Sequence, residues 1–383
     1  MKRIIISLLL AAALVLSLCG CLSAYRDVPS DVGRNSYAVS EYRTTMEYKE
    51  DFKILQLTDL HLGIECDLGD QLELIKKDIR ESEPDLIILT GDIFMYANKD
   101  IVRALISTLN DECRLLTEKR EGRLTKFAYT FGNHDNQGDY PRYFINSVIQ
   151  SYVTEDGREV EDSKYAAFVD YEDDNIFGLT NYYIDIVDDR AKSPDTVDVK
   201  YRIHIIDSNT YHFMGLDYDY DVIHEDQLLH AKKIYDTATA DKDYIGMAFF
   251  HIPLVEYEAA YQQFLASGET TGEGEYQDKH LPGYENNGAF DMLRAANIIS
   301  YFCGHEHKNN GDIIYNADSA DIAEKAIFSY GVKATNLLYH TTELIGYKTV
   351  TLKENMTKEE FLTVENILAN FKNERGGYAY YED

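Results

Sequence analysis

Five short motifs along the chain contain residue types that bind metal ions in proteins. They read Asp59-Leu-His61, Gly91-Asp92, Gly132-Asn-His-Asp135, a lone His251 and Gly304-His-Glu-His307. The motifs offer carboxylate, amide and imidazole groups but no thiolate. Such donors suit manganese, iron, zinc or similar ions and disfavour a closed structural zinc site. The motifs therefore predict a catalytic metal site.

The number of candidate ligands favours two metal ions over one. Seven donors are too many for a single ion that keeps a coordination position open, and about right for two ions that share a carboxylate. Two ions roughly 3.5–4 Å apart can hold both oxygens of an in-line displacement at phosphorus. The residues thus predict a dinuclear centre, of a kind that can promote displacement at phosphorus. The candidate ligands are Asp59, His61, Asp92, Asn133, His251, His305 and His307.

Each motif follows an apolar run that has the length of a buried strand. The first three runs alternate with amphipathic segments, an order that implies parallel strands with helices on the sheet faces. Ligands bind outside the carboxyl ends of such strands, so we expect the motifs to converge on one edge of the sheet. Strands are expected at 52–58, 85–90, 126–131, 244–250 and 298–303, and helices at 67–82 and 98–119.

The remaining segments predict a mixture of antiparallel strands and helices. A stretch rich in Gly and Glu, residues 268–288, predicts a long loop over the site. Further strands are expected at 165–171, 181–187, 201–207, 324–332 and 343–353, and further helices at 224–239, 255–267, 289–297 and 357–371.

The order of the motifs resembles the calcineurin-like metallophosphoesterase family, over residues 52–310. Phe249-Phe-His-Ile-Pro-Leu-Val-Glu-Tyr257 and Gly304-His-Glu-His-Lys-Asn309 resemble one branch of it, which contains Dcr2-type phosphatases and plant proteins of the purple acid phosphatase 29 type. The resemblance implies an α/β fold, a four-layer α/β/β/α sandwich with two mixed β-sheets. It also implies a phosphatase that needs two divalent metal ions.

The resemblance implies a role for each matching residue. A hydroxide between the two ions would attack phosphorus. His134 would stabilise or protonate the leaving oxygen, and Asp135 would orient His134 through a hydrogen bond. One metal ion is expected on Asp59, His61 and His307 and the other on Asn133, His251 and His305, with Asp92 as the bridge.

The sequence departs from purple acid phosphatases proper at two positions. Those enzymes carry a tyrosine three residues after the bridging aspartate, where this chain has Met95, and Tyr96 stands one position late. They also lack a histidine at the position of His61. We therefore expect no tyrosinate ligand and no purple colour, and the departure puts a ferric ion in doubt.

Polar residues outside the motifs receive weaker assignments. His280, in the loop over the site, and Asn181 are candidates for substrate contact. Glu306 stands between two ligands on a turn and is expected to point to solvent. The other histidines are expected to be surface or core residues: His204, His212, His224, His230 and His340.

The N-terminus resembles the signal sequence of a bacterial lipoprotein. A short basic start precedes the apolar run 4–18, which is short for a membrane span and fits a secretory signal. The sequence Leu18-Cys-Gly-Cys21 resembles a lipobox, which implies cleavage after Gly20 and a lipid on Cys21. The alternatives are an ordinary cleaved signal and an uncleaved anchor. We expect an exported protein, lipid-anchored to the outer face of the cell membrane.

This interpretation divides the chain into four parts. Residues 1–20 are the signal peptide, 21–50 a polar tether, 51–355 the metallophosphoesterase domain and 356–383 a C-terminal helix and tail. The chain has five cysteines, Cys19 and Cys21 among them. A core of this size needs no disulfide framework, so none is predicted.

Net charge limits the class of substrate. The formal net charge of −30 repels polyanions, which argues against nucleic acid as the partner. Small phosphate esters remain compatible, because bound metal ions can invert the local field. We expect a small or peptide-borne phosphate monoester. The alternatives are a phosphodiesterase or nucleotide hydrolase on the same scaffold and a non-catalytic surface lipoprotein that binds metal or a partner.

Overall fold

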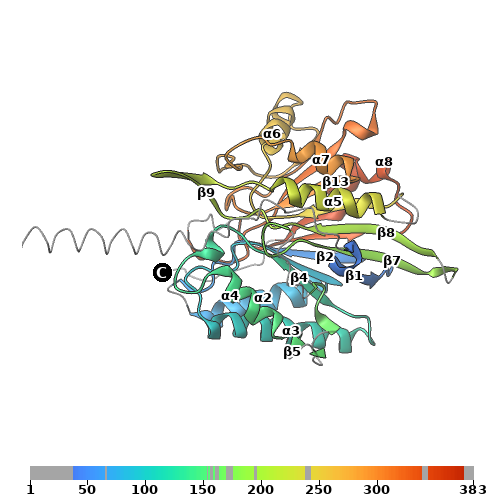
Figure 1. Cartoon of the computed structure of the whole chain (residues 1–383). Coiled ribbons are helices and arrows are strands. Elements are labelled where there is room, and N and C mark those ends of the chain that lie inside the picture. The colour runs from blue at the N-terminus through green and yellow to red at the C-terminus, as the bar shows by residue number, and fades with distance from the viewer. Residues whose placement is uncertain are drawn as a thin grey trace, which may run out of the picture.

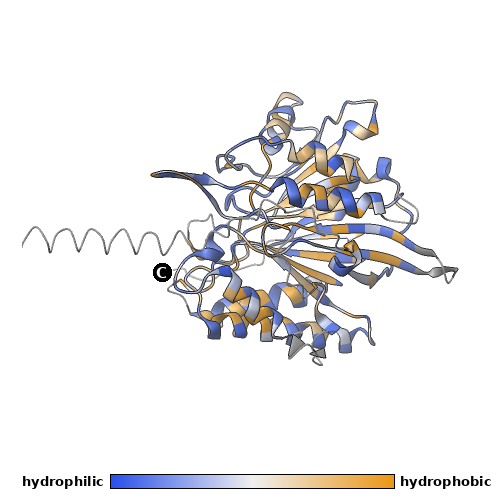
Figure 2. Ribbon diagram, viewed as in Figure 1, coloured by the Kyte–Doolittle hydropathy of each residue, from blue (hydrophilic) through white to orange (hydrophobic). Residues whose placement is uncertain are grey.

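The computed structural model describes residues 38–64, 67–152, 154–155, 158–159, 164–169, 176–193, 196–237, 243–338 and 344–374. Two β-sheets lie against each other, and helices cover the outer face of each sheet (Figure 1). The strands of the two inner layers are largely hydrophobic, whereas the outer sides of the helices are largely hydrophilic (Figure 2). The predicted four-layer sandwich of two mixed sheets is confirmed.

The five-stranded sheet carries the first three motifs. Its order is β17-β16-β2-β3-β4, with β2, β3 and β4 parallel as predicted and β16 and β17 antiparallel. Helices α2, α3 and α4 lie on its outer side (Figure 1). The bounds are β2 (Phe52–Leu57), β3 (Leu86–Thr90), β4 (Lys126–Thr130), β16 (Tyr347–Leu352), β17 (Phe371–Glu374), α2 (Leu68–Ser82), α3 (Lys99–Lys119) and α4 (Arg142–Gln150).

The eight-stranded sheet carries the two histidine motifs. Its order is β1-β7-β8-β11-β13-β15-β14-β12, and β8, β11, β13 and β15 run parallel. Helices α5, α6 and α7 cover its outer side (Figure 1). The bounds are β1 (Arg43–Glu47), β7 (Tyr182–Ser193), β8 (Thr196–Ile205), β11 (Ile245–Phe249), β12 (Gly272–Glu273), β13 (Ile298–Cys303), β14 (Asp312–Tyr315), β15 (Ala326–Tyr330), α5 (Glu225–Thr237), α6 (Glu256–Ala266) and α7 (Ala289–Ala295).

Smaller elements complete the fold. The hairpin of β9 (Tyr211–Met214) and β10 (Asp217–Tyr220) projects from the body of the molecule (Figure 1). None of the helices in the described ranges combines the length and apolarity needed to cross a bilayer. The other elements are β5 (Thr154–Glu155), β6 (Arg158–Glu159), η1 (Val39–Tyr42), η2 (His134–Asn136), η4 (Ile322–Glu324), α8 (Lys358–Phe361) and α9 (Val364–Asn370).

Hydrogen bonds between the two sheets hold the strand ends in register. The side chain of Gln56 on β2 donates to the carbonyl of Cys303 on β13 over 3.0 Å. Likewise the hydroxyl of Tyr182 on β7 donates to the carbonyl of Tyr129 on β4 over 2.7 Å. Apolar residues of both sheets form one core between them. The sandwich therefore presents strand ends from both sheets to a common region.

The predicted tether is wrong where the structure describes it. Strand β1 pairs in parallel with β7 at the edge of the eight-stranded sheet. Tyr42, Met46 and Tyr48 are buried in the core. These few apolar side chains suffice to anchor a segment whose overall composition is polar. The signal sequence and residues 21–37 lie outside the described residues.

Two further segments differ from the prediction. The expected helix 357–371 is two short helices, because Thr363 caps the second one with its side chain. Strand β17 then pairs with β16, so the segment up to Glu374 belongs to the sheet. Residues 165–169 form no strand beyond a single bridge from Ala166 to Phe127, and the end of the range expected there lies outside the described residues.

Candidate metal centre

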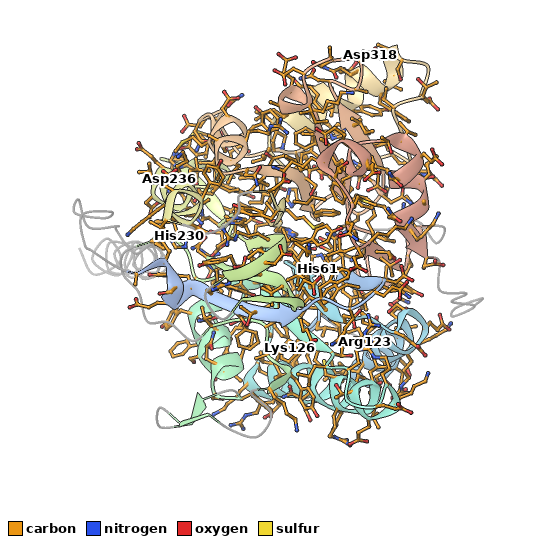
Figure 3. All side chains as sticks on the ribbon, turned by 90° about the vertical axis from the view of Figure 1, so that its right-hand side faces the viewer. His61, Arg123, Lys126, His230, Asp236 and Asp318 are labelled. Carbon is orange, nitrogen blue, oxygen red and sulfur yellow. The ribbon has the colours of Figure 1, made fainter. Side chains whose placement is uncertain are left out.

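All seven predicted ligands are buried at the carboxyl ends of five strands. The motifs follow β2, β3 and β4 in one sheet and β11 and β13 in the other. His61 lies near the centre of the molecule (Figure 3) and is fully buried. The predicted convergence of the motifs is confirmed, with the difference that both sheets contribute.

Three of these residues form a first donor group. Nε2 of His61 and Nε2 of His307 are 3.0 Å apart, and Oδ1 of Asp59 lies 3.3 Å from Nε2 of His307. The other carboxylate oxygen of Asp59 accepts hydrogen bonds from the Thr58 hydroxyl and the His305 backbone N–H. Among the described residues, Oδ1 has no hydrogen-bond partner. One carboxylate oxygen and two imidazole nitrogens therefore face one another.

Asp92, His251 and His305 form a second group. Oδ2 of Asp92 lies 3.2 Å from Nε2 of His251, which lies 3.4 Å from Nδ1 of His305. Nδ1 of His251 lies 2.9 Å from the carbonyl of Thr90. Because a carbonyl only accepts hydrogen bonds, Nδ1 carries a proton, and Nε2 is the nitrogen that faces the centre, where a bound cation would replace its proton.

Asp92 connects the two groups. Its Oδ2 atom is 3.8 Å from Nε2 of His61 in the first group as well as 3.2 Å from His251 in the second. Its Oδ1 atom accepts a hydrogen bond of 2.7 Å from the backbone N–H of His134. One carboxylate oxygen is thus fixed by the backbone, and the other faces both groups.

Asn133 offers a buried amide oxygen in the motif that follows β4. Its side-chain nitrogen donates to the hydroxyl of Tyr211 over 2.8 Å, and its Oδ1 atom has no partner among the described residues. The preceding Gly132 packs directly on Asp92 and His251. Asn133 therefore follows a residue that packs on the second group and carries an uncommitted oxygen.

The electrostatics of the centre fit bound cations. Burial opposes a charged His251, yet the carboxylates of Asp92 and Asp59 outweigh burial and raise its pKa to about 10. Burial lowers the pKa of His305 to about 3 and that of His61 well below its usual range. Metal ligation requires neutral imidazoles with free lone pairs, and buried carboxylates require a positive partner. The chain thus holds two adjoining groups of donors, each suited to one divalent ion.

The backbone at the centre is strained and closely packed. Asp59, His61, Asp92 and His305 all have positive φ angles, between 47° and 79°, which are uncommon for residues other than glycine. A Cβ atom on Gly132 would lie 2.3 Å from Oδ1 of Asp92. The glycine of this motif is therefore needed for the close approach of two strand ends.

Asp135 does not orient His134, and this prediction is wrong. Its two carboxylate oxygens accept hydrogen bonds of 2.7 Å from the backbone N–H groups of Phe94 and Gly132. Nδ1 of His134 has no hydrogen-bond partner in the described structure. Asp135 instead joins the loops after β3 and β4. The carboxylate of Asp135 is fully buried and lies within reach of two backbone N–H groups. It binds these donors instead of the partly exposed imidazole of His134.

His134 itself lies beside the donor groups. Its Nε2 atom is 3.9 Å from Oδ2 of Asp92, and its ring centre is 5.1 Å from that of His61. Its side chain is 25% exposed, whereas the ligand candidates are buried. It is therefore the histidine of this centre that solvent, and a substrate, can reach.

The structure does not support three of the weaker assignments. Glu306 is buried instead of solvent-exposed, and its carboxylate accepts the backbone N–H of Leu281. His280 packs on tyrosines, with Nδ1 2.8 Å from the hydroxyl of Tyr330. Asn181 is buried and bonded to Phe177 and Gln227. Turn position and loop composition do not reveal which way such side chains face.

Four of the histidines expected outside the centre are core or surface residues, as predicted. His204 and His230 are buried in the core. His212 stacks on Tyr284, and His224 pairs with Asp221. His340 lies outside the described residues. Tyr96 is exposed.

Sequence reasoning missed the residues that hold the ligands. The buried Lys333 donates to the backbone carbonyl of Asp59 over 2.7 Å. Tyr211 bonds the amide of Asn133, and the ring of Tyr220 stands edge-on to His305 with centres 4.3 Å apart. These residues belong to no motif and reach the centre from distant segments, so spacing gave no signal for them.

Tyr211→Phe is expected to weaken binding of the second metal ion by about 10- to 100-fold, the usual effect of losing a group that orients a ligand. The substitution removes the hydroxyl group that holds the amide of Asn133 and keeps the aromatic ring. Calorimetric titration of chelator-stripped protein with Mn²⁺ or Zn²⁺ measures the affinity. Tyr218→Phe, on the same hairpin and 60% exposed, is the matched control. Equal affinities in parent and Tyr211→Phe would contradict the assignment.

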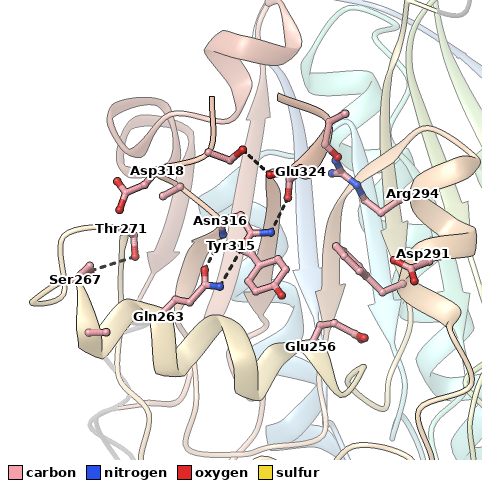
Figure 4. A pocket seen from close by; sticks show the side chains of 15 residues that line it. Glu256, Gln263, Ser267, Thr271, Asp291, Arg294, Tyr315, Asn316, Asp318 and Glu324 are labelled. Carbon is pink, nitrogen blue, oxygen red and sulfur yellow. Dashed lines mark hydrogen bonds between the residues drawn. The ribbon is translucent and has the colours of Figure 1, made fainter. Parts of the chain in front are cut away.

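A separate depression of about 900 Å³ lies on the outer side of the eight-stranded sheet (Figure 4). Residues of α6, α7, the end of β14 and the segment after it line the depression, among them Gln263, Arg294 and Tyr315. None of the seven ligand candidates borders it. This depression therefore belongs to a different part of the surface from the metal centre.

Several known proteins are similar to this chain in sequence or fold. The family described as calcineurin-like phosphoesterase matches residues 52–309. Phosphatase DCR2 of Saccharomyces cerevisiae is 27% identical over 277 residues, which cover 68% of this chain and 44% of that protein. The chain thus spans less than half the length of the yeast protein. Probable inactive purple acid phosphatase 29 of Arabidopsis thaliana is 24% identical over 68% of each chain. A solved dimetal phosphatase from Danio rerio has a TM-score of 0.45 and 13% identity, covering 80% of this chain and 94% of its own.

Proposed function

Because the chain belongs to the calcineurin-like phosphoesterase family, we propose that it is a metal-dependent phosphomonoesterase. The observation that carries the proposal is the pair of donor groups joined by Asp92. The first site would consist of Asp59, His61 and His307, and the second of Asn133, His251 and His305, with Asp92 shared. Manganese, iron or zinc suits this mixture of oxygen and imidazole donors.

Residues of this chain position the metal ligands and assist the leaving group, beside the chemistry that the metal ions would supply. Two divalent ions held by these donors would supply Lewis acidity that activates a water for attack on phosphorus and offsets the charge on the phosphoryl oxygens. Thr58, Lys333 and the Thr90 carbonyl keep Asp59 and His251 in position. His134, partly exposed beside Asp92, donates a proton or a hydrogen bond to the leaving oxygen.

The preference for monoesters is tested by comparing two chromogenic substrates. We expect a higher kcat/KM for p-nitrophenyl phosphate than for bis-p-nitrophenyl phosphate with the metal-loaded protein. A strong preference for the diester would support the phosphodiesterase alternative instead. The plant relative is named as probably inactive, so family membership alone does not decide activity. Absence of hydrolysis under every divalent ion tested would favour a non-catalytic binding role.

Removing the metal ions with a chelator is expected to lower the melting temperature by about 5 °C or more. A ligand present at a hundred times its Kd stabilises by about 2.7 kcal/mol, and two ions act together. Without cations, the buried carboxylates of Asp59 and Asp92 lose the compensation that divalent ions would provide. Differential scanning calorimetry measures the shift. Re-addition of Mn²⁺ or Zn²⁺ should restore the parent value, whereas an unchanged melting temperature would contradict the site.

Export and lipid anchoring remain a proposal from the sequence. The proposal rests on the basic start, the apolar run 4–18 and the lipobox-like sequence that ends at Cys21. A Cys21→Ala variant expressed in a bacterial host should lose incorporation of radiolabelled palmitate and move from the membrane to the soluble fraction. Unchanged fractionation would argue for an uncleaved anchor. Anchoring at the outer face would leave small or peptide-borne phosphate esters as substrates.

A further inference from the structure

The β9–β10 hairpin starts and ends at the metal centre. Tyr211, the first residue of β9, accepts the hydrogen bond from Asn133. Tyr220, the last residue of β10, places its ring against His305. Between these two contacts the hairpin projects away from the body of the molecule (Figure 1). Both ends of the hairpin therefore border the centre.

One face of the hairpin is entirely aromatic. In the antiparallel register Tyr211 pairs with Tyr220, and Phe213 pairs with Tyr218. Directly paired residues, and residues two apart on a strand, share a face of a hairpin. The four side chains therefore form a continuous row, with Tyr211 and Tyr218 in edge contact at 5.3 Å between ring centres. The row begins at the metal ligands and runs outward.

The outer half of this face is open to solvent and carries no charge. Phe213 is 52% exposed and Tyr218 is 60% exposed. The acidic residues of the hairpin, Asp217 and Asp219, pair with Met214 and His212 on the opposite face. An anionic group would meet a chain of strongly negative net charge here, whereas an uncharged aromatic ring would meet other rings.

We propose that this aromatic face binds the leaving group of the substrate and selects phosphate monoesters of aromatic alcohols, such as phosphotyrosine. The inference rests on the proposed phosphomonoesterase function. With the phosphoryl group at the donor groups, the ester oxygen points away from them, and a ring attached to it lies along Phe213 and Tyr218. An alkyl ester such as phosphoserine reaches no further than the inner end of the row.

The test compares O-phosphotyrosine with O-phosphoserine, which differ only in the leaving group. A Phe213→Ser/Tyr218→Ser double variant should lose about 5- to 30-fold in kcat/KM for phosphotyrosine, through KM, since each aromatic contact contributes modestly. The value for phosphoserine should stay within about twofold. Comparing each variant with the parent removes the intrinsic difference in reactivity between the two esters.

Met214→Ser is the matched control, because Met214 is 51% exposed on the opposite face of the same strand. This variant should leave kcat/KM unchanged for both substrates. Calorimetry with phenylphosphonate and methylphosphonate should show the same selective loss in the double variant. Equal losses for both esters, or no loss, would overturn the role of the hairpin. A parent protein that hydrolyses neither ester would instead contradict the proposed function.

Discussion

Asp92→Asn is expected to lower kcat/KM for p-nitrophenyl phosphate by about a thousandfold or more, an effect at the upper end of those seen when a single charge-stabilising group is removed. Oδ2 of Asp92 lies 3.2 Å from His251 and 3.8 Å from His61, so both donor groups depend on it. Asparagine keeps the shape and can still accept the backbone N–H of His134, but it loses the negative charge. Metal analysis should accordingly find about one ion per chain, or fewer, instead of two.

Asp139→Asn is a suitable control for this variant. Asp139 is exposed on the loop that follows the Asn133 motif, and its replacement removes the same unit of charge without touching the donor groups. Its activity should match the parent within about twofold. The assignment of Asp92 fails if its asparagine variant still binds two equivalents of metal and retains more than about a tenth of the activity.

The parts of the fold that the sequence predicted best are those governed by local pattern. Strands β2, β3 and β4 are short apolar runs, and the helices between them begin at Asp67 and Asn98, whose side chains cap them. Burial on both faces makes such strands uniformly hydrophobic, so their ends, and the polar motifs just beyond them, are visible in the sequence. The ligand candidates could be named for that reason.

Segments held by long-range pairing could not be placed in the same way. Strand β1 is polar overall and is a strand because β7 offers it an edge. Strand β17 follows a helical segment and exists because β16 lies beside it. In both cases the partner is far away in sequence, and the local composition favours another structure. Strand pairing at a sheet edge therefore overrode local preference.

The direction of individual side chains was the least predictable feature of the site. Asp135 follows His134 directly, yet its carboxylate turns to the backbone of Phe94 and Gly132. Glu306, between two ligand candidates, turns inward, where burial raises the pKa of its carboxyl group to about 8. Both outcomes depend on backbone donors that only the folded chain brings close. Motif spacing thus identified the members of the centre but not the groups that orient them.

His134 should contribute to bond cleavage without holding a metal ion. It belongs to neither donor group, and its partly exposed ring stands beside Asp92. General acid catalysis contributes about 10²- to 10⁴-fold, and its benefit grows with the basicity of the leaving group. His134→Ala should therefore lower kcat by about that factor for phosphoserine, whose alkoxide is a poor leaving group. For p-nitrophenyl phosphate, whose phenolate leaves readily, the loss should be only about tenfold.

The difference between the two substrates separates protonation from simple charge stabilisation. If His134 only stabilised charge on the phosphoryl group, both esters would lose activity equally, because that charge is common to them. Metal content should remain at the parent level, and a loss of metal would show that His134 is a ligand instead. His224→Ala is the control, since its side chain is 29% exposed, close to the 25% of His134, and pairs with Asp221 away from the donor groups. The effect of His134 is therefore measured as the ratio of the activity losses for the two substrates. General destabilisation of the fold would leave this ratio unchanged.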